Sequence, residues 1–212
     1  MTTKTLSIVI PIFPGFTALD AVGPYEVLRM LPGARVVFAG PERGVTRTDS
    51  GVIGLHADAA YSEIESADLL VFPGGQGTRP LLKDEPVLEW VRAIHETTQW
   101  TTSVCTGSLV LAAAGLLDGL DATTHWGQVA LLEKYGARYT AERVVRRGKI
   151  VTAAGVSSGI DMALTLAAAL AGDDVAKAIQ LAIEYDPQPP FDTGSPAKAG
   201  QRIIEICDTV LQ

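Results

Sequence analysis

Short runs of aliphatic and β-branched residues alternate along this chain with longer stretches in which apolar residues recur at helical spacing. The short runs predict strands over residues 6–12, 35–40, 67–72 and 100–104. The longer stretches predict helices over residues 17–31, 85–98, 108–114, 126–135, 157–171 and 173–184. Hairpins are expected within 41–55 and about Gly148. This alternation favours an α/β fold, with a mainly parallel sheet covered by helices on both faces.

Proline affects two of these segments. Pro24 lies inside the helical pattern of 17–31, so we expect the first turn of that helix to be separate or kinked. A stretch rich in proline and glycine, 187–196, reads as an extended tail before a final helix that runs from about residue 200 to Leu211. We find no internal repeat and no dividing linker. We therefore expect residues 1–212 to form a single domain that ends in this tail helix.

The most informative motif is Ser103-Val104-Cys105-Thr106-Gly107, which joins a predicted strand to a predicted helix. A nucleophile elbow has this arrangement, because small neighbours allow a strained turn to push one side chain into a pocket. At the start of a helix, free N–H groups and the helix dipole favour the thiolate form of Cys105, whereas burial opposes it. We interpret Cys105 as the nucleophile of an enzyme. Cys207 lies in an apolar helical pattern and is more simply a packing residue.

Composition excludes several classes of partner. The formal net charge is −7 and there is no basic block, so neither nucleic acid nor an anionic membrane is expected to bind. No apolar run approaches the roughly 18 residues of a membrane span, and the first residues lack the pattern of a secretion signal. With two cysteines, a disulfide framework is not expected and a cytoplasmic location is the default.

Three further residue groups are candidates, and each also has an ordinary structural explanation. Asp20 could exchange protons with a substrate, or it could simply cap a helix. The pair Gly74-Gly75 follows a buried strand and could present N–H groups to a developing negative charge, or form a plain turn. His125 could be a structural hydrogen-bonding residue. Neither metal-ligand spacing nor a phosphate loop nor a dinucleotide fingerprint occurs, so we expect no metal and no cofactor.

Several motifs together resemble the DJ-1/PfpI superfamily. They are the Phe72-Pro73-Gly74-Gly75 loop, the Cys105 elbow and the Ala122-Thr123-Thr124-His125-Trp126 segment. Within that superfamily the isocyanide hydratases are most similar, through residues 19–24, 105–117 and 154–161. The resemblance implies a flavodoxin-like three-layer sandwich, a homodimer, and a lyase that hydrates a small isocyanide to an N-formamide without a cofactor.

The resemblance also implies roles for individual residues. Cys105 would attack the isocyanide carbon to give a thioimidate, and Asp20 would serve as general acid and base. The backbone N–H groups of Thr106 and Gly75 would line the anion-stabilising side of the pocket. The Val156 N–H would point toward the sulfur, near the start of a helix. His125 would lie at the same pocket without an assigned role.

The sequence departs from the wider superfamily in two places and leaves two other functions open. Ser103 stands where many of these elbows have glycine, and Thr106 replaces the histidine of protease-like members, which argues against proteolysis. One alternative is another superfamily activity, such as glyoxalase- or deglycase-like chemistry or redox sensing. The other is an amidase-like sensor domain of an AraC-type regulator lacking its DNA-binding part. The natural isocyanide is not indicated.

Overall fold

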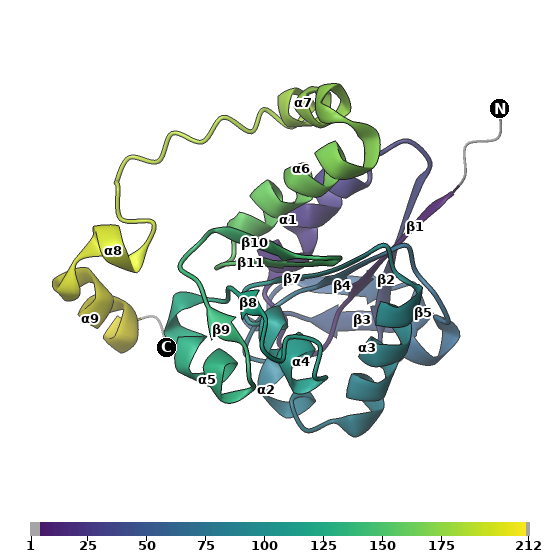
Figure 1. Cartoon of the computed structure of the whole chain (residues 1–212), viewed down its shortest axis with the longest axis horizontal. Helices are drawn as coiled ribbons and strands as arrows, with labels where there is room; N and C mark the ends of the chain where they lie inside the picture. The colour runs from purple at the N-terminus through teal and green to yellow at the C-terminus, as the bar shows by residue number, and fades with distance from the viewer. Residues whose placement is uncertain (1–4, 211–212) are drawn as a thin grey trace.

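Seven strands form one sheet in the computed structural model, which describes residues 5–210 (Figure 1). In spatial order these strands are β10 (Val144–Arg147), β11 (Ile150–Ala153), β7 (Trp100–Val104), β6 (Leu69–Phe72), β1 (Leu6–Pro11), β2 (Ala34–Gly40) and β5 (Ala59–Ala60). All neighbours are parallel except the β10–β11 hairpin. Two small sheets pair β3 (Gly44–Arg47) with β4 (Gly54–Ala57) and β8 (Asp121–Ala122) with β9 (Arg138–Tyr139).

Helices cover both faces of the sheet. The bounds are α1 (Ala18–Leu28), α2 (Thr78–Leu81), α3 (Glu85–Thr97), α4 (Gly107–Ala113), α5 (Val129–Lys134), α6 (Ser158–Ala171), α7 (Asp173–Ala182), α8 (Pro196–Ala199) and α9 (Gln201–Val210), with 3₁₀ turns at η1 (Tyr61–Glu63) and η2 (Trp126–Gln128). Helices α1, α6 and α7 lie on one side, and α2, α3, α4 and α5 lie on the other (Figure 1). The predicted α/β fold with a mainly parallel sheet is confirmed.

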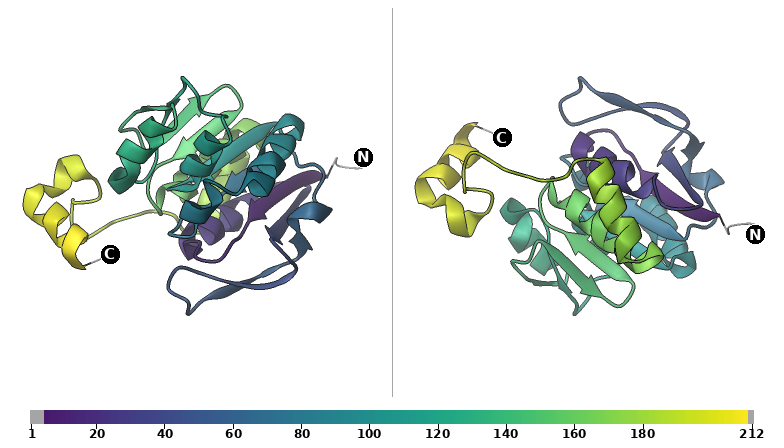
Figure 2. Two further views of the ribbon diagram at one scale, coloured as in Figure 1. Left: turned by 90° about the horizontal axis from the view of Figure 1, so that it is seen from below. Right: turned by 90° about the horizontal axis from the view of Figure 1, so that it is seen from above.

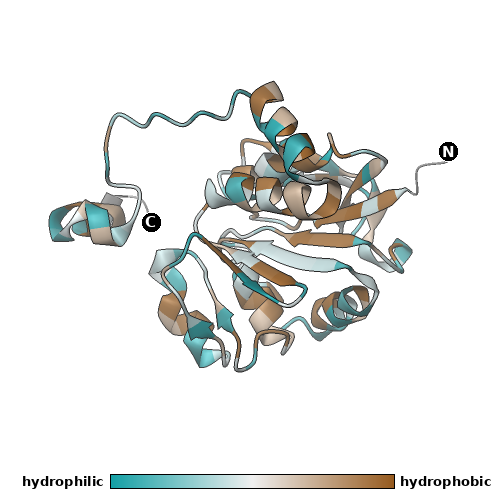
Figure 3. Cartoon of the chain, turned by 45° about the horizontal axis from the view of Figure 1, so that its top comes forward, coloured by the Kyte–Doolittle hydropathy of each residue, from teal (hydrophilic) through white to brown (hydrophobic). Residues whose placement is uncertain are grey.

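Helices enclose the central strands on both sides, and β1 and β6 are mainly apolar, whereas β7 buries Thr101, Thr102 and Ser103 (Figure 3). Every residue of β6 is buried, and α3 turns Leu88, Val91 and Ile94 inward at the spacing of one helical face. Full burial of such a side chain contributes about 1.5–3 kcal/mol relative to exposure. This packing fixes the carboxyl ends of the strands, where the loops that carry the candidate residues begin.

Helix α1 differs from its prediction, because it is one continuous helix that contains Pro24. Proline has no N–H to donate to the carbonyl four residues earlier, and this alone would favour a break. Packing against α6 compensates: a Cβ added at Gly23 would lie 3.1 Å from Ile160, and one added at Gly159 would lie 3.1 Å from the Pro24 ring. The close approach of the two helices holds α1 together and fixes Asp20 in its first turn.

The sequence patterns did not predict the shortest strands and helices. Strands β5, β8 and β9 have two residues each, and α2 has four, too few to show a period. Both predicted hairpins are present, as β3–β4 and β10–β11. The predicted helix over 126–135 begins with the 3₁₀ turn η2 before α5.

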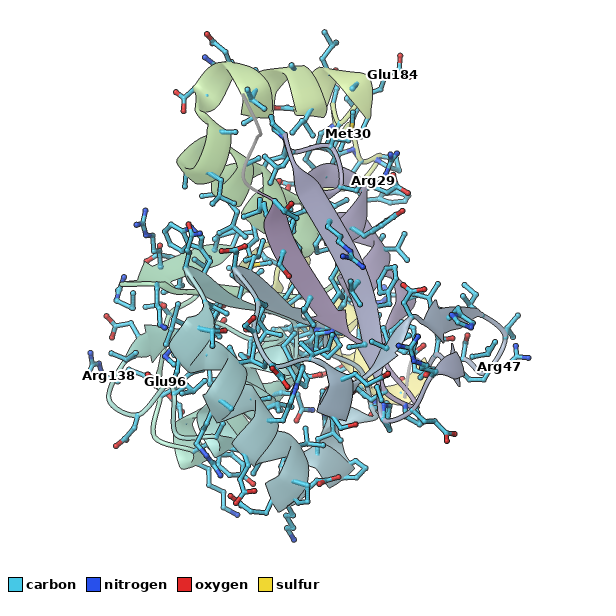
Figure 4. The ribbon with its side chains drawn as sticks, turned by 90° about the vertical axis from the view of Figure 1, so that its right-hand side faces the viewer. Arg29, Met30, Arg47, Glu96, Arg138 and Glu184 are labelled. Carbon is cyan, nitrogen blue, oxygen red and sulfur yellow. The ribbon has the colours of Figure 1, made fainter. Side chains whose placement is uncertain are left out.

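The tail leaves the body after α7 and carries α8 and α9 away from the sheet (Figure 2). Leu211, the predicted end of the last helix, lies outside the described residues, as do residues 1–4 of the predicted domain. Exposed side chains such as Arg47, Arg138 and Glu184 mark the periphery of the molecule (Figure 4). Within residues 5–210, none of the helices is long and apolar enough to cross a membrane.

Candidate active site

Cys105 lies at a strained turn between β7 and α4. Its backbone has φ of +56°, a left-handed conformation that is uncommon for residues other than glycine and that costs about 1–3 kcal/mol. The turn is held from several sides. The Cys105 N–H donates to Ala154 O at 2.8 Å, and its carbonyl accepts hydrogen bonds from the hydroxyls of Ser108 (3.0 Å) and Thr124 (3.1 Å). These contacts support the predicted elbow geometry around the thiol.

Asp20 reaches the elbow from the first turn of α1 and is fully buried. It is not a helix cap, since its Oδ2 accepts a hydrogen bond from the Gly74 N–H at 2.9 Å. Glycine at position 74 makes this approach possible, because a Cβ there would lie 2.5 Å from Thr106 N and 2.8 Å from Asp20 Oδ2. The other carboxyl oxygen, Oδ1, is buried and forms no hydrogen bond of good geometry with any described residue.

Burial raises the pKa of Asp20 to about 7. The Gly74 N–H and a hydrogen bond with the Cys105 thiol act in the opposite direction, and the negative charge of Asp49 raises the pKa further. A carboxyl group with a pKa near 7 is present in both protonation states at neutral pH. It is therefore suited to accept a proton and return it in one reaction cycle.

Burial favours the neutral, protonated form of the Cys105 thiol. Burial raises the pKa of Cys105 to about 12, and the charge of Asp20 raises it further. The opposing hydrogen bonds from the backbone N–H groups of Thr106 and Val156, and from the Thr106 side chain, are too weak to reverse this. Because Cys105 is only 5% exposed, burial outweighs the effect of the elbow position, and the thiolate forms only when a base takes the proton.

The contact between Thr106 and Gly75 differs from the expectation that the N–H groups of both residues line the anion-stabilising side of the pocket. The Gly75 N–H donates to the Thr106 hydroxyl at 2.9 Å, so it does not face the sulfur as a free donor. The same hydroxyl lies 3.2 Å from Gly75 O and 3.3 Å from Thr78 Oγ1. Side-chain hydrogen bonding by Thr106 therefore holds the glycine loop against the elbow, and the donors at the sulfur are the N–H groups of Thr106 and Val156.

Val156 is the second strained residue at the site. Its φ of +22° is exceptional for a β-branched side chain. Val156 lies in the loop between β11 and α6, and the strain coincides with the hydrogen bond of its N–H to the Cys105 sulfur. The role expected for this N–H at the sulfur stays a prediction.

His125 lies at the wall of a larger hollow beside the elbow. It is the N-cap residue of η2, where its Nδ1 accepts the Gly127 N–H at 3.2 Å, and its ring packs against the backbone of Gly155. The hollow measures about 980 Å³ and is lined by body residues such as Thr124, His125 and Val156 and by tail residues such as Pro189 and Phe191. Two of these wall residues also contact Cys105: the Thr124 hydroxyl donates to the Cys105 carbonyl, and the Val156 N–H lowers the pKa of its thiol.

The sequence interpretation missed Thr124 and Arg79, and it expected the Gly74 N–H to face a developing negative charge, whereas this N–H donates to Asp20. Thr124 donates its hydroxyl to the Cys105 carbonyl, and no pattern in a single sequence signals such a contact. Arg79 had a signal, since it is a lone cation directly after the glycine loop. The part of the chain that the structure describes holds no group of three or more His, Cys, Asp or Glu side chains placed for a metal ion.

Replacing Gly74 by alanine is expected to destabilise the protein by about 1–3 kcal/mol and to displace Asp20. The new methyl group would overlap Thr106 N, which cannot move without the elbow. Urea unfolding measures the loss. Gly194→Ala is the control, because nothing lies within 4 Å of the added Cβ there, and it should shift stability by less than about 0.5 kcal/mol. Equal stability of the two variants would contradict the predicted crowding.

Comparison with known proteins places this arrangement in a family. The model of the DJ-1/PfpI family matches residues 6–169, which include every candidate residue described above. The chain belongs to the DJ-1/PfpI family. The family resemblance predicted from the sequence motifs is thereby confirmed.

Three individual proteins illustrate how similar this chain is to known sequences and structures. This DJ-1/PfpI protein is 43% identical to an isonitrile hydratase of Pseudomonas putida over 194 residues, which cover 92% of this chain and 85% of the relative. A solved ThiJ/PfpI family protein from Pseudomonas syringae superposes with a TM-score of 0.91 at 33% identity, covering 97% of this chain and 88% of that one. The regulator CdhR of Pseudomonas aeruginosa is 33% identical over 78% of this chain, which spans 51% of the regulator.

Proposed function

We propose that this DJ-1/PfpI protein is an isocyanide hydratase, a lyase that adds water to an isocyanide and releases an N-formamide. The observation that carries the proposal is the burial of Asp20 and Cys105 against one loop. Asp20 Oδ2 accepts the Gly74 N–H at 2.9 Å, and a Cβ at Gly74 would lie 2.8 Å from this oxygen and 2.5 Å from the backbone nitrogen of Thr106, the residue next to Cys105. The similarity over most of both chains to an enzyme named for this activity gives independent support.

The first chemical step forms a sulfur–carbon bond. The terminal carbon of the isocyanide is attacked by the Cys105 sulfur as ionised Asp20 takes the thiol proton. Asp20 then returns this proton to the former isocyanide carbon, which gives a thioimidate. The N–H groups of Thr106 and Val156 stabilise negative charge on the sulfur during the attack, because they already hydrogen-bond to it.

The second step consumes water and restores the thiol. Asp20, ionised again, removes a proton from water as the oxygen adds to the thioimidate carbon. That proton goes to the nitrogen, and the carbon–sulfur bond breaks as the formyl C=O forms. The hydroxyl proton of the adduct returns to the sulfur through Asp20. One isocyanide and one water thus give one N-formamide, with one carboxyl group acting as both base and acid.

The raised pKa of the thiol argues against a redox-sensing role. Sensor cysteines are accessible and have low pKa values, since the thiolate is the form that peroxide oxidises. Cys105 is buried, and its pKa is about 12. A thiol that loses its proton only when Asp20 acts as a base suits catalysis, because the sulfur then becomes reactive only as it attacks a bound substrate.

The direct test uses purified protein and p-nitrophenyl isocyanide, with the matching formamide identified by chromatography against an authentic standard. We expect multiple turnovers in metal-free buffer containing a chelator. Failure to form any formamide from this substrate or from a small alkyl isocyanide would refute the proposed activity.

The pH dependence of kcat/KM is expected to follow the ionisation of the Cys105–Asp20 pair. The reactive form of the pair carries one proton in total, with Asp20 ionised and the thiol protonated. This form prevails between the two pKa values, about 7 and about 12. Below pH 7 the second proton binds, so kcat/KM should fall about tenfold for each pH unit; above pH 8 it should be constant. A profile that stays flat from pH 5.5 to 9.5 would contradict the acid–base role.

A further inference from the structure

Arg79 is a half-buried cation that the mechanism above does not use. It lies in α2, directly after the glycine loop, and its Nη1 donates to Thr78 Oγ1 at 2.8 Å. Thr78 Oγ1 in turn lies 3.3 Å from the hydroxyl of Thr106, the neighbour of the nucleophile. A short chain of polar contacts therefore ties the guanidinium to the elbow.

No carboxylate within the described residues 5–210 neutralises this cation. Six other arginines form ion pairs there: Arg29, Arg43, Arg92, Arg138, Arg143 and Arg147. Arg79 has only the bond to Thr78, although a guanidinium carries five N–H donors. Partial burial of a charge without a counter-ion is unfavourable, so the position favours binding of an anion.

The charge of Arg79 acts on both the nucleophile and the wall of the hollow. A Cys105 thiolate would raise the pKa of Arg79, and the positive charge of Arg79 lowers the pKa of His125 below its usual value, although burial is the larger cause there. These electrostatic effects agree with the contacts: the Thr78 hydroxyl accepts from Arg79 Nη1 at 2.8 Å and lies 3.3 Å from the hydroxyl of Thr106, so the guanidinium is two side chains away from the residue next to Cys105.

We propose that Arg79 binds a carboxylate on the substrate, so that the preferred isocyanides carry an anionic group close to the isocyano carbon. This inference rests on the proposed hydratase function and extends it to the substrate class. Arginine suits the task because its planar fork binds a carboxylate through two parallel hydrogen bonds. Arg79 is then a specificity residue, whereas Cys105 and Asp20 carry out the reaction.

Alkylation of Cys105 tests the anion site without requiring hydratase activity. Iodoacetate and iodoacetamide have the same shape and differ in charge. Their rates at Cys105 are measured by mass spectrometry of the peptide, in a Cys207→Ala background. The iodoacetate-to-iodoacetamide rate ratio should fall about tenfold on Arg79→Gln, and Arg79→Lys should give an intermediate ratio, because lysine keeps the charge but not the two parallel hydrogen bonds. An unchanged ratio, or failure of both reagents to modify Cys105, would overturn the proposal.

Hydration of isocyanoacetate and of isocyanoacetamide provides the matching catalytic test. We expect Arg79→Gln to lower kcat/KM for isocyanoacetate about 10- to 100-fold, mainly through KM, and to leave isocyanoacetamide within about threefold. Equal losses on both substrates would show that Arg79 acts on the thiol or the fold, and would overturn the proposal. If the wild-type protein hydrates neither compound nor p-nitrophenyl isocyanide, the hydratase function fails, and the alkylation ratio still decides the role of Arg79.

Discussion

Replacing Cys105 by alanine is expected to lower the rate of formamide formation by at least about 10⁴-fold. The sulfur is the group that forms the bond to carbon, and no other group at the site can take over covalent catalysis. Product formation from p-nitrophenyl isocyanide, followed with excess enzyme over long incubations, gives the range needed to measure such a loss. Substantial residual activity would remove Cys105 from the mechanism.

Two comparisons make this result specific to the sulfur at the elbow. Cys207→Ala removes the other thiol, which lies in α9, and should keep wild-type activity. Cys105→Ser keeps a hydroxyl at the same strained turn and should be nearly as inactive as the alanine variant, because Asp20 is too weak a base to ionise an alcohol. Circular dichroism of each variant checks that the fold is retained.

Replacing Asp20 by asparagine is expected to lower kcat/KM by about 10²–10⁴-fold, the range typical for loss of a positioned acid–base group. The amide oxygen can still accept the Gly74 N–H, so the loop contact survives while proton exchange is lost. The dependence on pH near 7 should disappear together with the activity. A variant that keeps both the rate and the pH profile would refute the assigned role.

The same substitution should stabilise the folded protein above neutral pH. The Asp20 pKa is about 7 in the folded chain, against an ordinary value of 3.8, so the folded state binds this proton more tightly than the unfolded state does. Binding of this proton stabilises the folded state by its full amount, at most about 4 kcal/mol, below pH 4. This contribution is lost as the pH rises through 7. Asp20→Asn should therefore melt above the wild type at pH 8, with a smaller difference at pH 5.

Asp49→Asn provides the matched control for Asp20. It makes the same carboxyl-to-amide change at an exposed residue whose negative charge raises the pKa of Asp20. Activity above pH 8 should stay within about threefold of wild type, and the rise of kcat/KM should move to slightly lower pH. A loss as large as that of Asp20→Asn would show that general charge, rather than the carboxyl beside the sulfur, governs the rate.

The amino-acid sequence by itself determined the fold class and the position of the candidate nucleophile, Cys105. Parallel strands buried on both faces tend to be apolar, so β1 and β6 are visible as short runs of aliphatic residues, and β7 is visible through its β-branched residues. The elbow was visible because strand, cysteine and helix are adjacent in the chain. Local patterns of this kind depend only on residues that are close together in the chain, so the sequence alone reveals them.

Only the tertiary structure decided the state of the thiol and the partners of the loop. Whether Cys105 is ionised depends on the competition between burial and hydrogen bonding. Burial prevails because the Gly74 loop after β6 and Ala154 after β11 lie against the elbow and leave Cys105 only 5% exposed. The Gly75 N–H is taken by Thr106, 31 positions away, and Asp20 meets Gly74 across 54 positions. Contacts between such distant residues follow from how the layers pack, which no spacing along the chain records.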